Sequence, residues 1–461
     1  MSFKDTVTEK FMWFAGKVGN QKHLVAVRDS FIAMMPLTMA GSIAVLLNVF
    51  FRDIPNNMGW TGFAKAMAPL IEINGYVYFG TIAISALVFA FSIGYNLSQT
   101  YKVNPIAGGL VSFASFVSII PQTVKISISL AGADANLLKT LADLGMVVTG
   151  SGSKAVLETS TWGAITTAYA GATGLFTALI IGFVSSMIYC KLMNKNVTIK
   201  MPDSVPPAVS KAFAAIIPGT LAIYASSVLG YLAFAATGSS LTDLISAYIQ
   251  KPLLGLSQGL FSVVLLSFLV QLFWFFGLHG HNVLAPIMDG IYQPALLENT
   301  SVWEATHDIS KLPWLWTRGS FDAYAQMGGS GVTIALIIAI FLFSKRDDYK
   351  TVAKLSAPMG IFNINEPITF GIPMVLNPLF VIPWLIVPPI CAAIAYLATQ
   401  AGLIPPVYLA VPWITPPGLY AFLATGNNLM AGLVSLFNVF VAFLIWTPFV
   451  ISANKVKSPT E

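Results

Sequence analysis

Residues 355–454 contain a single charged side chain, that of Glu366. Soluble domains carry about 25% charged residues, so a stretch of this length with one charge does not suit a fold surrounded by water. An ionisable group at membrane depth costs at least ~2.5 kcal/mol, and it persists where it is paired, hydrated or functional. The stretch therefore predicts a membrane-embedded chain, in which Glu366 is the first candidate for a functional residue.

The whole chain has the composition of a membrane protein, with 56% hydrophobic and 9% charged residues. A helix that crosses a bilayer needs about 20 mostly apolar residues. Nine apolar runs meet or approach this length, namely 31–51, 75–97, 104–121, 164–190, 212–237, 255–276, 332–344, 376–400 and 429–452. The sequence thus predicts an all-α polytopic membrane protein.

The basic residues lie between the apolar runs, which indicates membrane orientation rather than nucleic-acid binding, although the net charge is +5. Loops rich in Lys and Arg tend to stay in the cytoplasm, and here they are the N-terminus, 191–211, 345–354 and the C-terminus. Placing all of them on one side requires a further crossing somewhere between 277 and 331. We therefore expect about ten transmembrane helices with both ends cytoplasmic.

Two segments are expected to lie along the membrane surface. The first 30 residues combine scattered Phe, Trp and Val with several lysines, which predicts an interfacial amphipathic helix and no cleaved signal peptide. The amphipathic segment 238–254 is expected to join two membrane domains, 1–240 and 241–461. The polar, Gly/Ser-rich stretches 122–157 and 301–331 are expected to be loops, partly outside or partly re-entrant.

Prolines recur throughout the membrane-embedded part of the second domain. Each proline removes an amide donor and disfavours helix at the preceding residue. Broken backbone at membrane depth survives where protein or a water-filled cavity satisfies it, and transporters build substrate sites this way. We therefore expect two re-entrant hairpins, at 358–378 and 403–428.

Two clusters of polar residues are candidates for a binding site. His279 and Asn282 follow the apolar run 255–276, while Asn363 and Asn365 closely precede Glu366. Histidine can act as an acid or a base, and a carboxylate can accept hydrogen bonds from sugar hydroxyls or act as a base towards one. The alternatives stay open: the histidine could face interfacial water at a helix end, and the carboxylate could pair with a lysine or cap a hairpin.

Trp274 and Trp413 flank these clusters, and an aromatic face suits the apolar face of a sugar ring. The alternative for both is the aromatic belt at the membrane surface, where Trp is enriched. Cys190 and Cys391 form no CxxC or metal pattern and are expected to pack in the core. With no Walker A or HExxH motif, we expect no nucleotide cofactor and no metal.

Two segments resemble the signatures of a known family. Trp-Phe-Phe-Gly-Leu-His-Gly (274–280) and Asn-Ile-Asn-Glu-Pro-Ile-Thr-Phe-Gly (363–371) are similar to those of the sugar permease, or IIC component, of the phosphoenolpyruvate-dependent phosphotransferase system, lactose/cellobiose/diacetylchitobiose family. The segment 200–209 also resembles that family's cytoplasmic segment. The resemblance extends from about residue 5 to residue 455.

This resemblance implies a bacterial plasma-membrane protein, a homodimer with ten spans per subunit. The first domain would form the dimer contact, and the second, with the two hairpins, would bind a disaccharide. A phosphorylated IIB protein, expected to be a separate polypeptide, would dock at the cytoplasmic face and phosphorylate the sugar 6-hydroxyl. Glu366 matches the family's glutamate that holds this hydroxyl, and His279 matches the histidine beside it. Trp274 matches an aromatic residue near the sugar, and Trp413 falls where the family places a second aromatic residue.

His281 matches no position of the family motif, and no role is assigned to it. The sequence does not select among cellobiose, diacetylchitobiose and lactose, although we favour cellobiose-like β-linked glucosides. The alternative functions are a proton-coupled secondary sugar transporter, with Glu366 as the proton site, and a non-catalytic membrane channel.

Overall fold

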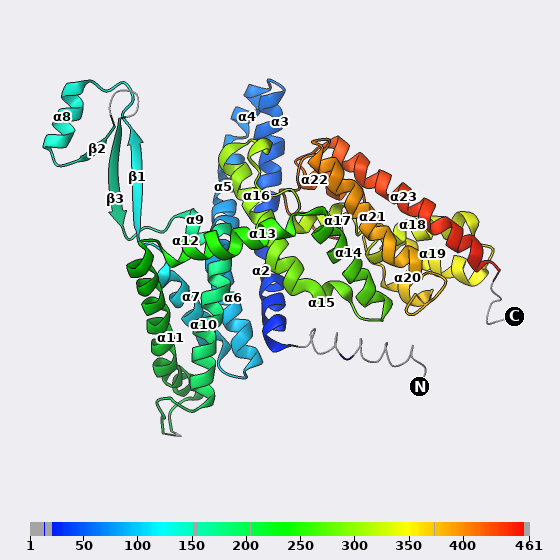
Figure 1. Ribbon diagram of the computed structural model, residues 1–461, viewed down its shortest axis with the longest axis horizontal. Coiled ribbons are helices and arrows are strands. Elements are labelled where there is room, and N and C mark those ends of the chain that lie inside the picture. Colours follow the sequence, from blue (N-terminus) through cyan, green and yellow to red (C-terminus); the bar gives the residue numbers. More distant parts are fainter. Residues whose placement is uncertain (1–12, 14–20, 151–154, 203, 373, 456–461) are drawn as a thin grey trace.

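The computed structural model describes Trp13 and residues 21–150, 155–202, 204–372 and 374–455. The chain in these ranges is mainly helical, as predicted. The amphipathic helix expected within the first 30 residues lies largely outside them. In Figure 1 most helices of residues 85–237 stand on the left, most of those after residue 258 stand on the right, and α2 runs between them.

The first half contains long helices packed side by side, among which α6, α7, α10 and α11 form a bundle. The helices of this half are α2 (Lys22–Asn48), η1 (Val49–Asp53), α3 (Ile54–Asn57), α4 (Thr61–Ala66), α5 (Ala68–Phe79), η2 (Ile82–Ile84), α6 (Ser85–Thr100), α7 (Pro105–Ile119), α8 (Ala135–Asp143), α9 (Thr167–Ala170), η4 (Ala172–Gly174), α10 (Leu175–Asn194) and α11 (Pro207–Thr237).

Small residues allow α6 and α7 to pack closely. A Cβ on Gly94 of α6 would lie 2.4 Å from the Ser112 Cβ and 2.5 Å from the Gly108 carbonyl oxygen of α7. Lipid tails are as apolar as the helices, so membrane helices associate through close backbone packing rather than through the hydrophobic effect. The Ser112 hydroxyl adds a hydrogen bond of 2.5 Å to the Ala90 carbonyl oxygen of α6. These contacts hold the bundle together.

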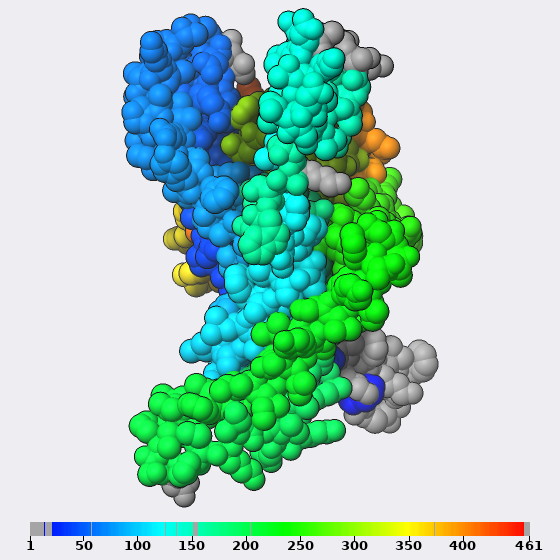
Figure 2. Space-filling model, turned by 90° about the vertical axis from the view of Figure 1, so that its left-hand side faces the viewer, coloured from blue at the N-terminus to red at the C-terminus, as the bar shows by residue number. Residues whose placement is uncertain are grey.

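The stretch predicted as a loop at 122–157 contains a small antiparallel sheet, which the sequence analysis missed. Its strands, in the order β1–β3–β2, are β1 (Thr123–Ser129), β2 (Val147–Thr149) and β3 (Val156–Trp162). Figure 2 shows this segment and α8 as a lobe separate from the lobe of α3–α5. In Figure 1 it lies at the opposite end of the bundle from the basic 191–211 loop, as expected for a segment outside the cell.

A bent helical segment joins the two halves, as predicted for 238–254. It consists of α12 (Leu241–Ile245), η5 (Ser246–Gln250) and α13 (Lys251–Ser257), and it turns by 74° into the next helix. The second half contains α14 (Leu260–Phe275), α15 (Gly280–Ile287), η6 (Met288–Tyr292), α16 (Gln293–Thr306), η7 (Ile309–Lys311), α17 (Arg318–Tyr324), η8 (Ser330–Val332), α18 (Thr333–Phe343), α19 (Asp347–Ile361), α20 (Glu366–Gly371), α21 (Val381–Gln400), α22 (Leu419–Ala424) and α23 (Leu429–Ala453).

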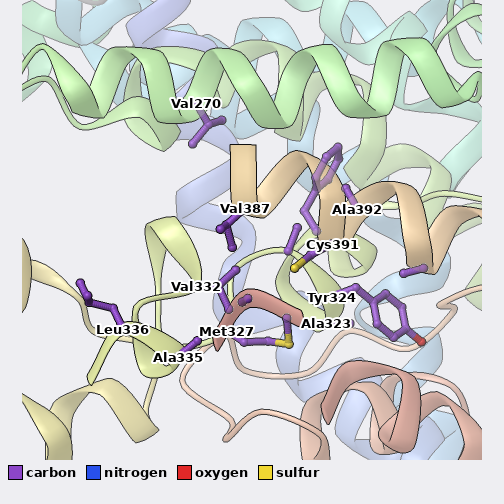
Figure 3. Packing of buried hydrophobic residues seen from close by; sticks show 14 of the residues in the cluster. Val270, Ala323, Tyr324, Met327, Val332, Ala335, Leu336, Val387, Cys391 and Ala392 are labelled. Carbon is purple, nitrogen blue, oxygen red and sulfur yellow. The ribbon is translucent and has the colours of Figure 1, made fainter. Parts of the chain in front are cut away.

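The buried apolar residues of the second half form one large cluster that joins α14, α17, α18, α21 and α23. Figure 3 shows part of it, where Val387 and Cys391 of α21 lie between Val270 of α14 and Val332. Both Cys190 and Cys391 are free and buried, which confirms their prediction as core residues. The apolar residues of the first half form mainly separate clusters.

The predicted apolar runs correspond to helices of the structure. Within the described residues six helices are long and apolar enough to cross a membrane, and the bent pair 241–257 and 260–275 would make a seventh. Two shorter apolar helices, Pro105–Ile119 and Ser330–Phe343, correspond to the runs 104–121 and 332–344. The total of ten crossings stays a prediction.

The tenth crossing was expected in the region 277–331, and this region is mainly helical. Its last part, 301–331, was expected to be a loop but also contains helix. The elements α15, η6 and α16 follow one another without a break from Gly280 to Thr306. At 1.5 Å per residue this length is sufficient for a bilayer. The short helix α17 then occupies part of the predicted loop 301–331.

The packing of α6 on α7 predicts that Gly94→Leu destabilises the protein, because the new side chain would overlap the α7 backbone and overpacking costs typically 1–3 kcal/mol. Thermal unfolding of the purified protein in detergent should show a lowered Tm and a lower folded yield. Gly75→Leu in α5 is the control, since nothing lies within 4 Å of a Cβ there. Equal Tm values for the two variants would contradict this packing argument.

Candidate functional site

A cavity of about 340 Å³, lined mainly by the second half, brings together all seven predicted site residues. The wall includes Glu366 at the start of α20, His279 and Asn282 around the start of α15, and Trp274 near the end of α14. Its remaining lining residues are Ile32, Met35, His281, Ala285, Met288, Asp289, Arg318, Asp322, Gln326, Gly329, Ser330, Asn363, Asn365 and Trp413. Residues far apart in the sequence therefore meet at one site.

Glu366 faces His279 across this cavity. The Glu366 Oε1 and His279 Nε2 atoms are 3.9 Å apart, and the two side chains are 46% and 41% exposed. Among the described residues Lys354 makes no ion pair with Glu366, so the alternative of a structural pair with that lysine is not observed. The carboxylate stands at the first residue of α20, where the helix dipole favours a negative charge. The negative charge is thus favoured at this helix end, and the side chain is open to the cavity.

The orientation of the His279 ring follows from its position as the N-cap of α15. The Asn282 backbone N–H donates a hydrogen bond of 3.3 Å to the His279 Nδ1 atom. A neutral imidazole that accepts at Nδ1 carries its proton at Nε2, so this contact places an N–H group toward Glu366. The Trp274 ring supports the histidine from the side, with ring centroids 4.5 Å apart.

A close helix contact fixes the histidine relative to α14. A Cβ on Gly280 would lie 2.0 Å from the Val270 carbonyl oxygen and 3.0 Å from the Trp274 ring. Only glycine therefore fits at the start of α15, and its absent side chain lets the chain fold back tightly against α14. This contact explains why the motif needs glycine directly after His279.

Asn363 connects three chain segments and is a positioning residue. Its Oδ1 accepts a hydrogen bond of 2.7 Å from the Gly328 N–H. Its Nδ2 donates to the carbonyl oxygens of Trp413 and Thr415 at 2.6 and 2.8 Å. Because these bonds occupy the amide on both sides, Asn363 orders the wall of the cavity; its predicted contact with substrate stays a prediction.

The other predicted residues differ in how much surface they offer a ligand. Asn365 is buried and donates to the Thr369 hydroxyl at 3.0 Å, and Trp274 is 3% exposed. Asn282 and Trp413 are exposed, the latter by 45%. The open surfaces are therefore those of Glu366, His279, Asn282 and Trp413.

His281 lies in the same wall, behind His279. Its Nδ1 atom is 3.3 Å from the Ser330 hydroxyl, and its ring centroid is 5.9 Å from that of His279. It therefore connects the start of α15 to the glycine-rich segment 328–331. Among the described residues no three His, Cys, Asp or Glu side chains gather in a way that would hold a metal ion.

The sequence analysis missed three charged residues of the cavity wall, Asp289, Arg318 and Asp322. Arg318 lies between the two carboxylates, with Nε 2.9 Å from Asp289 Oδ1 and Nη1 2.8 Å from Asp322 Oδ1. The same three residues line a second, smaller cavity of about 130 Å³, which shares Ile32, Met35 and Trp413 with the first. The sequence offered one weak signal, the spacing of Arg318 and Asp322 by one helical turn.

The fold and the cavity define a polytopic membrane transport protein with a polar ligand site among broken helices. Residues 28–388 match the family model of the phosphotransferase system EIIC component. The cellobiose-specific EIIC component of Lactococcus lactis is 43% identical, with 96% of each chain covered. The oligo-beta-mannoside-specific EIIC component of Bacillus subtilis is 33% identical over 99% of this chain and 95% of its own.

A solved structure agrees with these relatives. The crystal structure of the transporter ChbC, the IIC component of the N,N'-diacetylchitobiose-specific phosphotransferase system, matches with a TM-score of 0.84 and 32% identity over 96% of each chain. This chain belongs to the EIIC family of the phosphotransferase system. It is therefore a multi-pass permease component of the plasma membrane, which confirms the resemblance noted in its two signatures.

The role of Asn363 predicts that Asn363→Asp destabilises the unliganded protein. The change removes both Nδ2 donors and places a carboxylate oxygen against two carbonyl oxygens, and leaving such groups unpaired costs about 1–3 kcal/mol each. Thermal unfolding without ligand should show a clear drop in Tm. Asn428→Asp is the control, since its side chain caps α23 as an acceptor and Asp caps equally well. A Tm loss of the same size in both variants would refute the positioning role.

Proposed function

We propose that this chain imports a β-linked disaccharide of the cellobiose type, and that a phosphorylated IIB protein transfers its phosphoryl group to the sugar 6-hydroxyl at Glu366 and His279. The names of the relatives support this choice of substrate, since they include cellobiose-specific components of Lactococcus lactis and Geobacillus stearothermophilus. The ChbC match is named for another disaccharide, N,N'-diacetylchitobiose.

The spacing of Glu366 and His279 is the observation that carries this proposal. Their facing atoms are 3.9 Å apart, which is too long for a direct hydrogen bond. A hydroxyl oxygen between them can lie within hydrogen-bond distance of both. It would donate its proton toward Glu366 Oε1 and accept from His279 Nε2–H. The pair thus suits a neutral alcohol that is about to lose a proton.

The proposed transfer is a simple exchange. The 6-hydroxyl oxygen forms the new bond to phosphorus, the bond between phosphorus and the IIB cysteine sulfur breaks, and the sulfur leaves as a thiolate. Glu366 accepts the hydroxyl proton as general base. Since phosphoryl transfer depends mainly on positioning and electrostatics, an open carboxylate and an oriented histidine are sufficient groups for the chain to supply.

The partners follow from the same proposal. The IIB protein would dock at the cytoplasmic face, where the basic loops are expected. The 1–240 domain would form a homodimer and the 241–461 domain would bind and move the sugar. The largely separate apolar clusters of the two halves support this division.

Uptake into vesicles tests the proposal directly. Vesicles that contain the protein should convert labelled cellobiose to a sugar phosphate when phosphorylated IIB is present inside, and should accumulate little label without it. Free sugar accumulating with a proton gradient would instead support the proton-coupled transporter. No uptake of any β-linked disaccharide with phosphorylated IIB present would overturn the proposal.

Glu366→Gln is expected to lower the rate of sugar phosphorylation by about 10²–10⁴-fold, the range that a general base contributes. Sugar binding should persist in part, because the amide can still hydrogen-bond the hydroxyl. The measurement is sugar phosphate formed per minute, beside the Kd for cellobiose. Glu158→Gln in the exposed strand β3 is the control. A normal phosphorylation rate in Glu366→Gln would remove the proposed role.

His279→Ala is expected to reduce the transfer rate more than it reduces folding, because the ring provides the Nε2–H group that faces Glu366. The transfer rate and the Tm should be measured together. His23→Ala in the first half provides a histidine control away from the cavity. If His279→Ala loses expression and folding to the same degree as transfer, the histidine is structural.

A further inference from the structure

Three lysines lie around one tyrosine where three helix ends meet in the first half of the chain. Lys22 is the first residue of α2, Lys102 directly follows Tyr101 at the end of α6, and Lys191 lies in the last turn of α10. All three lysines are exposed. In Figure 1 the start of α2 lies at the lower end of the bundle, the end that also carries the basic 191–211 loop. The junction therefore belongs to the face where the basic loops gather.

Tyr101 connects these helix ends to one another. The Lys22 Nζ atom lies 3.8 Å from the centre of the Tyr101 ring, which is a cation–π contact. The Asn194 Nδ2 atom donates a hydrogen bond of 3.4 Å to the Tyr101 carbonyl oxygen, and this bond joins the end of α10 to the end of α6. Both Lys22 and Lys191 lie close enough to the His23 ring for their charges to act on it. The two ammonium groups therefore share one junction.

The positive charge of this junction is not neutralised within the described residues. Lys22, Lys102 and Lys191 form no ion pair there, and the first carboxylate along α2, that of Asp29, is paired with Arg28. Because α2 has no acidic residue in its first turn, Lys22 also opposes the dipole of its own helix. Like charges that are held together repel one another, and a bound anion would remove this repulsion. The junction thus favours an anionic ligand.

An apolar strip extends from the lysines along α10. Phe183 and Met187 precede Lys191 by eight and four residues, so the three side chains lie on one face of the helix. Phe183 and Met187 are partly exposed, and both pack against the apolar cluster of the first half. A cationic end that continues into an apolar face matches a phospholipid, whose anionic headgroup is joined to acyl chains. A small soluble anion would make no use of this strip.

We infer that this junction binds an anionic phospholipid, with the phosphate between Lys22 and Lys191 and an acyl chain along the apolar strip of α10. Basic pockets between membrane helices bind the headgroups of acidic lipids in this way. The site is separate from the sugar cavity, because Ile32 of α2, which lines that cavity, lies about 15 Å further along the helix than Lys22. The lipid would hold the start of a helix whose later turns line the cavity.

Lipid binding to the purified protein in detergent, measured by native mass spectrometry, tests the inference. The probe is phosphatidylglycerol, and phosphatidylcholine with the same acyl chains is the lipid without net charge. In Lys22→Gln/Lys191→Gln the Kd for phosphatidylglycerol should rise by about 10- to 30-fold, the loss expected for two lysines at a membrane surface. The Kd for phosphatidylcholine should change by less than about twofold. Lys65→Gln/Lys139→Gln removes the same charge from α4 and α8, at the opposite end in Figure 1, and should change neither value.

Further measurements separate a lipid from other anionic partners. Excess glycerol phosphate should not displace phosphatidylglycerol, because it lacks the acyl chains; displacement would assign the junction to a soluble anion and overturn the inference. The Tm of the double variant in detergent without added lipid should match that of the unaltered protein, and Lys191→Gln alone replaces it if it does not fold.

Unchanged phosphatidylglycerol affinity in the folded variant, or an equal loss for phosphatidylcholine, would also overturn the inference. A loss of phosphorylated IIB binding with lipid binding intact would assign the lysines to a protein partner instead. None of these results depends on which sugar the cavity binds, so the proposed function stands or fails separately.

Discussion

Where a helix ends inside a membrane, its free N–H and C=O groups need hydrogen-bond partners that lipid cannot supply. In this protein one asparagine side chain provides such partners. The Asn363 amide accepts from the N–H of Gly328 and donates to the carbonyl oxygens of Trp413 and Thr415. Each of these groups would otherwise cost several kcal/mol in a lipid environment. The three breaks in helical structure therefore stabilise one another. The cavity lies where these three breaks meet.

This arrangement places the site residues at helix ends and in the turns beside them. Glu366 begins α20 three residues after Asn363, and His279 caps α15 where Gly280 contacts α14. The wall is completed from the first half of the chain, since Ile32 and Met35 of α2 line both cavities. The shape of the site thus depends on how α2 packs against the second half. A ligand in this cavity would contact both expected domains.

Features that depend on local composition could be predicted from the sequence. The apolar runs follow from the scarcity of charge, and the helix after residue 240 follows from its amphipathic pattern. The sheet was missed although β1 alternates in the way strands do, because its residues were judged by their polarity alone. The role of Asn363 could not be predicted, since a sequence does not show which partners its amide already has. Arg318 and Asp322 were missed because they lie in the polar stretch 301–331, which was expected to be a loop.

Glu366, the single charge of residues 355–454, is not isolated in the folded protein. Glu366 is isolated along the chain, yet in space it shares a cavity with Asp289, Arg318 and Asp322. The cavity wall thus carries three carboxylates and one guanidinium, of which Asp289 and Asp322 contact Arg318 directly. Such a site tolerates a neutral sugar, whose hydroxyls satisfy the charges without adding another. A sugar that gained a phosphate would be repelled by the same walls, because like charges interact strongly where water is scarce. The charges that would hold the substrate would therefore also favour release of the phosphorylated product.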